Sequence, residues 1–166
     1  MGVTSFAYRL VLLLHILSAI IGFGGVLLNG VYASRAKKRP PAEGLAVMEV
    51  NTFVSVKVAE IFIYLTAFWG LGLIGLSDKT FKFSQTWIWL AIIVYVIALG
   101  ISHGLLMPRV KKLLAGMRAA VSGGGATDAP APAELAKLEP QIGAISVALD
   151  IALVVILVLM IWKPGF

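Results

Sequence analysis

Four long apolar stretches, separated by short polar or charged segments, dominate the hydrophobic pattern of this chain. The first covers residues 10–32 (LVLLLHILSAIIGFGGVLLNGVY), carries no formal charge and would be apolar on every side of a helix. At about 1.5 Å of rise per residue, roughly 20 apolar residues cross a hydrocarbon layer about 30 Å thick. The pattern therefore predicts an all-α, polytopic membrane protein built as a bundle of four transmembrane helices.

We expect one membrane domain over residues 1–166. Its spans cover about residues 8–32, 53–76, 84–107 and 141–162. Between them, the pattern predicts a short interfacial helix over 42–52 and a basic surface helix over 109–120. Residues 121–139 contain the stretch SGGGATDAPAPA, whose Gly/Pro/Ala-rich composition predicts a flexible cytoplasmic loop. Pro140 then marks the start of the fourth span.

The composition agrees with a membrane protein and excludes several chemistries. Hydrophobic residues make up 60% of the chain and charged residues 13%, whereas a soluble domain has about 25% charged residues. The chain contains no cysteine, which excludes disulfides, thiolate metal sites and cysteine nucleophiles. It also contains no Walker loop, no HExxH motif and no Ser/His/Asp set.

One glycine motif matches a dinucleotide-binding fingerprint by its letters alone. Residues 70–75 read GLGLIG, but they follow no strand and lie inside the second span, so the dinucleotide interpretation fails. We expect these glycines to allow close approach between helices instead. The same expectation applies to the small-residue pairs Ser18/Gly22 and Gly100/Gly104, each spaced four apart.

The distribution of Lys and Arg predicts the orientation in the membrane. The segments after the first and third spans carry nine cations: Arg35, Lys37, Lys38, Arg39, Arg109, Lys111, Lys112, Arg118 and Lys137. The other side carries four: Arg9, Lys79, Lys82 and Lys163. Because positive loops stay in the cytoplasm, we expect both termini outside. The net charge of +6 lies beside apolar spans, so it indicates anionic lipid headgroups rather than nucleic acid.

Ionisable residues inside the spans are the candidates for function. Four of them are predicted near the cytoplasmic side and form an intramembrane polar cluster: Lys57, Glu60, His103 and Asp150. The cluster has three interpretations. Lys57 and Glu60 could neutralise each other while Asp150 bonds a neighbouring helix. The cluster could instead be a proton or cation site, or Lys57 could extend to the headgroups. We predict that Asp150, His103 and Glu60 converge on the bundle interior.

His15 is the fifth ionisable residue and lies near the outer side, roughly 9 Å into its span. It could bond a carbonyl, Ser or Thr across a helix interface. It could also ligate haem or copper. His15 and His103 cannot share one haem, because the topology separates them by roughly 15 Å along the spans. A single His ligand, or His15 paired with Met160, stays open.

Two segments resemble a known family: LLHILSAIIGFGGVL near the start and DIALVVILVLMIWKPGF at the end. The chain resembles the bacterial predicted integral membrane proteins of domain-of-unknown-function family 2269. That family is similar to the four-helix CopD copper-resistance group and to HemJ-type protoporphyrinogen oxidases. The resemblance implies a functional role for His15, the histidine of the shared LH dipeptide. Here GGVLLNGVYASRA replaces the Pro-Arg-Leu stretch and further histidine of the HemJ type, so that oxidase activity is not implied.

Together these observations predict a small, multi-pass protein of the bacterial inner membrane. We expect an accessory or cofactor-binding protein of the CopD-like type, in which His15 binds the cofactor and haem is the candidate. The alternatives are a transporter or proton-coupled component using Glu60, His103 and Asp150, or a structural subunit of a membrane complex. The sequence favours a protein without enzymatic activity. The expected partner is the lipid bilayer. A membrane-protein partner and a homo-oligomer both stay open.

Overall fold

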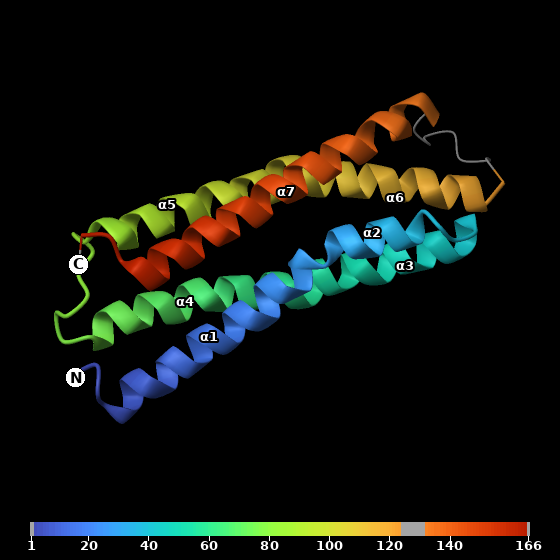
Figure 1. The fold of residues 1–166 in the computed structure, drawn as a ribbon. Coiled ribbons are helices and arrows are strands. Elements are labelled where there is room, and N and C mark those ends of the chain that lie inside the picture. Colours follow the sequence, from blue (N-terminus) through green and yellow to red (C-terminus); the bar gives the residue numbers. More distant parts are fainter. Residues whose placement is uncertain (1, 124–131, 166) are drawn as a thin grey trace. The chain divides into compact units, whose positions relative to one another are not determined.

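A computed structural model describes residues 2–123 and 132–165, and all regular elements in this part of the chain are helical (Figure 1). The elements are α1 (Phe6–Leu27), α2 (Asn29–Ala36), α3 (Pro41–Phe53), η1 (Val54–Ala59), α4 (Glu60–Leu76), α5 (Thr86–Ile101), η2 (Ser102–Leu106), α6 (Met107–Val121) and α7 (Pro132–Trp162). The segments η1 and η2 are π-helical. The prediction of an all-α fold is confirmed.

These elements join into four helices that are long and apolar enough to cross a membrane: Phe6–Ala36, Pro41–Leu76, Thr86–Val121 and Ala133–Trp162. The shortest has 30 residues and the longest two have 36. At about 1.5 Å per residue even 30 residues exceed a hydrocarbon layer of about 30 Å. The prediction of four helices able to span a membrane is therefore confirmed, and each helix is longer than a crossing needs.

The extra helical length corrects several predicted boundaries. The predicted interfacial helix at 42–52 is part of α3, and the predicted surface helix at 109–120 is part of α6, each continuous with a span. Residues 132–139, predicted as loop, form the first turns of α7, while 124–131 lie outside the described residues. Pro140 lies inside α7 and does not begin it. The reason lies in tertiary contacts, since Leu138 is buried and Glu139 pairs with Lys37 at 2.8 Å.

The described chain divides into two compact units, each of which contains a segment of every long helix. Unit 1 comprises Met1–Leu27, Phe53–Ile93 and Val155–Phe166. Unit 2 comprises Leu28–Thr52 and Val94–Val154. The single domain over residues 1–166 stays a prediction.

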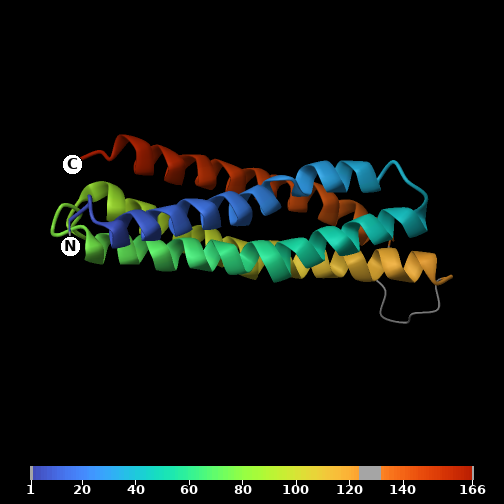
Figure 2. The same ribbon diagram turned by 90° about the horizontal axis from the view of Figure 1, so that it is seen from below.

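In unit 1, α1 packs along η1 and α4, and Figures 1 and 2 show α1 beside α4. Small residues allow this approach: a Cβ at Gly22 would lie 2.8 Å from the Ile63 nitrogen, and one at Gly25 would lie 2.9 Å from Cβ of Ala59. Ser18 is also buried. The expected close approach of helices at Ser18/Gly22 is therefore confirmed. Small residues commonly permit such an approach between membrane helices.

The same expectation is wrong for Gly100 and Gly104 in unit 2. A Cβ at either position would meet no atom within 4 Å. Two glycines four residues apart are therefore not sufficient to bring a second helix close.

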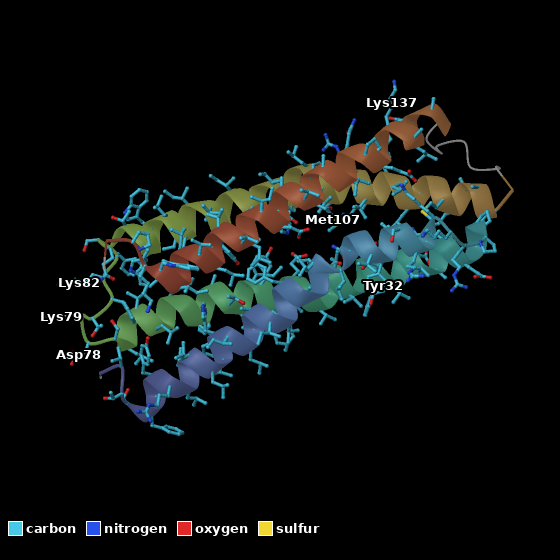
Figure 3. The ribbon with its side chains drawn as sticks, in the orientation of Figure 1. Tyr32, Asp78, Lys79, Lys82, Met107 and Lys137 are labelled. Atoms are coloured by element: carbon cyan, nitrogen blue, oxygen red, sulfur yellow. The ribbon has the colours of Figure 1, made fainter. Side chains whose placement is uncertain are left out.

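Both ends of the described chain and the turn between α4 and α5 lie at one end of unit 1, as Figures 1 and 2 show. Figure 3 shows Asp78, Lys79 and Lys82 in that turn. The buried hydroxyl of Ser77 organises it, donating to the Ile74 carbonyl at 2.8 Å and accepting from the Phe81 amide at 3.0 Å. An even number of spans produces this placement of the termini; their location outside the cell stays a prediction.

Unit 2 has its own small apolar core. Ala36, Met48 and Leu114 form its buried cluster, which joins α2, α3 and α6. Three ion pairs connect the same helices and α7: Lys37–Glu139, Lys112–Glu134 and Arg118–Glu49. Their side chains are largely exposed, so each pair contributes at most about 1 kcal/mol to stability. The pairs orient the helices while the apolar cluster supplies most of the packing energy.

Large apolar side chains of the spans remain exposed in the described structure. Phe6, Ile20, Phe68 and Ile161 are each at least 62% exposed. Such exposure over whole helices would be unfavourable in water, where apolar area is driven into a core. It suits a hydrocarbon surrounding, and it supports the assignment as an integral membrane protein.

Candidate functional site

His15 lies on α1 and bonds the backbone of α4 inside unit 1. Its Nδ1 lies 2.8 Å from the carbonyl oxygen of Thr66, and the imidazole is half-buried. Because a carbonyl oxygen only accepts, Nδ1 donates the proton of this bond. The neutral ring then carries its lone pair on Nε2, the nitrogen that can accept a proton or bind a metal.

Gly70 makes the Thr66 carbonyl accessible to the ring. In an α-helix the side chain at i+4 leans toward the carbonyl at i, because Cα–Cβ bonds tilt toward the N-terminus. Gly70 has no such side chain, and a Cβ there would lie 3.2 Å from Cε1 and 3.4 Å from Nδ1 of His15. The Thr66 hydroxyl donates to the Phe62 carbonyl at 2.8 Å, so it forms no hydrogen bond with the imidazole. We call His15, Thr66 and Gly70 the His15 niche.

The niche leaves one ring nitrogen available. Within the part of the chain that the structure describes, Nε2 of His15 forms no hydrogen bond. Metal-binding histidines are commonly held in this way, with the other ring N–H donated to a carbonyl or carboxylate that fixes tautomer and orientation. The geometry can therefore present one neutral nitrogen ligand, or a proton acceptor, from a fixed position.

Lys57 and Glu60 both belong to unit 1, but they do not pair. Lys57 lies in η1 with an exposed side chain, and it forms no ion pair or hydrogen bond with a residue that the structure describes. Glu60 instead accepts a hydrogen bond of 3.0 Å from the hydroxyl of Tyr64, one turn further along α4. The wider π turn moves position i+3 away from the face of Lys57. In the described structure Lys57 and Glu60 therefore form no ion pair with each other, and the intramembrane polar cluster stays a prediction.

His103 and Asp150 belong to unit 2. His103 lies in η2, is exposed, and its Nδ1 donates to the Leu99 carbonyl of its own helix at 3.0 Å. Asp150 is partly buried on α7, and its carboxylate bonds no residue among those described. Glu60 lies in the other unit. The predicted convergence of Asp150, His103 and Glu60 therefore stays a prediction.

Two structural features beside the candidate residues were not predicted from the sequence. Thr66 and Gly70 have the i,i+4 spacing of residues on one helix face, but nothing in the sequence connects that face with His15. The π segments η1 and η2 contain Lys57 and His103, and no residue pattern predicted them. Such segments are rare and are frequently found at functional sites.

Comparison with known proteins gives one result. A family model described as a predicted integral membrane protein (DUF2269) matches residues 9–164, which include nearly all of the four long helices. No curated protein and no solved structure matches the chain.

Proposed function

We propose a function from the premise that this chain belongs to the DUF2269 family of predicted integral membrane proteins. The function is that of a small accessory protein of the bacterial inner membrane, which binds a cofactor through Nε2 of His15. The resemblance of the LH dipeptide to CopD-like proteins supports the same residue. We assign no enzymatic step to the protein.

The observation that carries this proposal is the 2.8 Å hydrogen bond from Nδ1 of His15 to the Thr66 carbonyl. It fixes the tautomer that a metal ligand needs and leaves Nε2 available. A histidine that merely joined two helices would need only the same bond. The free nitrogen inside a span is the feature that a purely structural histidine does not require.

Haem suits this site better than a bare copper ion. In haem the porphyrin supplies most of the iron's ligands, so the protein would need to contribute only one or two. In the described residues no group of three or more His, Asp or Glu could hold a metal ion. A copper ion would therefore lack a set of protein ligands. When bound, haem would supply electron-transfer or gas-binding chemistry, and His15 would hold its iron.

The test is the absorbance spectrum of the protein purified from haem-supplied cells, or titrated with haem in detergent. We expect a Soret band in the wild type and in the matched control His103→Ala, and its loss in His15→Ala. Circular dichroism checks that each variant remains helical. A wild-type protein that takes up no haem, or a His15→Ala protein with an unchanged spectrum, would contradict the proposal.

A second candidate is a proton-coupled component of a membrane complex. The observation that favours it is that Lys57 and His103, two predicted cluster residues, each lie in a π segment. The predicted interior position of Asp150 can be tested by stability. Asp150→Asn keeps the shape and should change thermal unfolding little, while Asp150→Leu should lower stability if the carboxyl has polar neighbours. A rise in stability with Leu would indicate a lipid-facing carboxyl and remove this candidate.

A further inference from the structure

An open apolar groove of about 300 Å³ lies between α2 and α3 in unit 2. Tyr32 of α2 lines one side, and Ala46, Val47 and Val50 of α3 line the other. Tyr32, labelled in Figure 3, is 43% exposed, and Val50 is 63% exposed. The groove therefore lies at the surface, and of its lining residues Val47 also packs against the buried cluster around Met48.

The polarity of the surroundings changes along the groove. Toward the connection of α2 and α3, Arg35 follows Tyr32 by one helical turn, and Arg39 pairs with Glu43 at 3.3 Å. In the other direction the exposed side chains are apolar, with Leu28 48% and Val31 55% exposed. Along α2, the cation Arg35 therefore lies on the side of Tyr32 toward the connection to α3, and the apolar residues lie on the side toward α1.

Unit 2 also has more positive charge than its acids neutralise. Its described glutamates all form ion pairs, with Lys37, Arg39, Lys112 and Arg118. Four exposed cations have no such partner among the described residues: Arg35, Lys38, Lys111 and Lys137. Of these, Arg35 lies on α2 one helical turn after the groove residue Tyr32, and its guanidinium bonds no residue among those described. A planar guanidinium matches the oxygens of a phosphate group better than an ammonium does.

We propose that this groove binds one anionic phospholipid, with its phosphate group on Arg35 and an acyl chain along Tyr32, Ala46, Val47 and Val50. The match is one of chemistry: a lipid is apolar at one end and anionic at the other, as the groove requires. Arg35 lies near the end of the helix Phe6–Ala36, and lipid headgroups lie at the ends of spans. The proposal is independent of the His15 niche.

Native mass spectrometry of the detergent-purified protein tests the proposal, with phosphatidylglycerol and phosphatidylcholine as probes. We expect the wild type to retain one phosphatidylglycerol in preference to phosphatidylcholine. Arg35→Gln should weaken phosphatidylglycerol binding roughly five-fold and abolish the preference, by the usual size of one headgroup contact. The matched control is Lys111→Gln, which removes an equally unpaired cation away from the groove and should leave the preference unchanged.

Ala46→Phe tests the acyl chain. Ala46 is exposed, so the larger ring fills the groove without entering the buried cluster, and both lipids should then be lost. Val50→Asn offers a second variant that makes the groove polar without adding bulk. Glycerol phosphate, added as a soluble competitor, distinguishes a lipid site from a simple anion site.

Three outcomes would overturn the proposal. Equal losses in Arg35→Gln and Lys111→Gln would indicate diffuse charge rather than a site. Displacement by glycerol phosphate at the lipid's own concentration would indicate an anion site without an acyl chain. Unchanged binding in both Ala46→Phe and Val50→Asn would exclude the groove as the place where the lipid binds.

Discussion

The acceptor that holds the His15 ring is a main-chain carbonyl, so no substitution on α4 removes it directly. The side chains of α4 instead control the access of the His15 ring to this carbonyl. Gly70 keeps the Thr66 carbonyl open, and the Thr66 hydroxyl is occupied by Phe62. A position that looks like part of a glycine-rich packing motif therefore determines which nitrogen of a histidine carries the proton.

We predict that Gly70→Val breaks the bond between His15 and the Thr66 carbonyl. The added methyl groups would overlap the ring, since a Cβ alone already lies 3.2 Å from Cε1. The free energy of unfolding should fall by about 1–3 kcal/mol, measured by thermal unfolding in detergent. Nitrogen NMR of the His15 ring should show loss of the single Nδ1–H tautomer.

Gly75→Val provides the matched control on the same helix. A Cβ at Gly75 meets no atom within 4 Å, so both stability and the tautomer of His15 should stay close to the wild type. If the two variants behaved alike, the role given to Gly70 would be wrong.

At the scale of the helices, the unexpected feature is their continuity. The sequence predicts separate short helices over 42–52 and 109–120 and a loop over 132–139, whereas all three segments extend the long helices. Their stability comes from one another, through the cluster of Ala36, Met48 and Leu114 and through interhelical ion pairs. Most helical stability in proteins comes from such packing rather than from intrinsic preference.

Pro140 gives a direct test of where α7 begins. Proline in a helix interior removes one hydrogen bond and clashes with the preceding turn, at a cost of about 3 kcal/mol. In the first turn it costs nothing. Since α7 begins at Pro132, Pro140→Ala should raise the thermal unfolding temperature, with a gain of about 1–3 kcal/mol. Pro164→Ala, beyond the end of α7, is the control, and equal responses would place the start of α7 at Pro140.

At the scale of the whole molecule, the surplus of positive charge on one side of the spans predicts the topology. The absence of cysteine makes single-cysteine variants simple to interpret. In intact cells, Ser122→Cys should react only with a membrane-permeant thiol reagent, whereas Lys79→Cys should also react with an impermeant one. The reverse pattern would place both termini in the cytoplasm.

The sequence by itself determined the membrane class, the four apolar helices and the choice of His15 as a candidate functional residue. These depend on local properties: the length of an apolar stretch decides whether a helix can cross a bilayer, and a histidine inside one is costly wherever it points. The comparison with DUF2269 agrees with that class. No contact between distant residues is needed to reach any of these conclusions.

The remaining features were decided only by the tertiary structure, because the local sequence pattern does not predict them. The partner of His15 is the carbonyl of Thr66, 51 positions away, and main-chain carbonyls are the same in every residue. The failure of Lys57 and Glu60 to pair follows from a π turn, which has no composition signature. The early start of α7 is accompanied by the burial of Leu138 and by ion pairs of Glu139 with Lys37 and of Glu134 with Lys112. The partner of His15 and the start of α7 depend on contacts between segments far apart in the chain, and these contacts form only when the helices pack together.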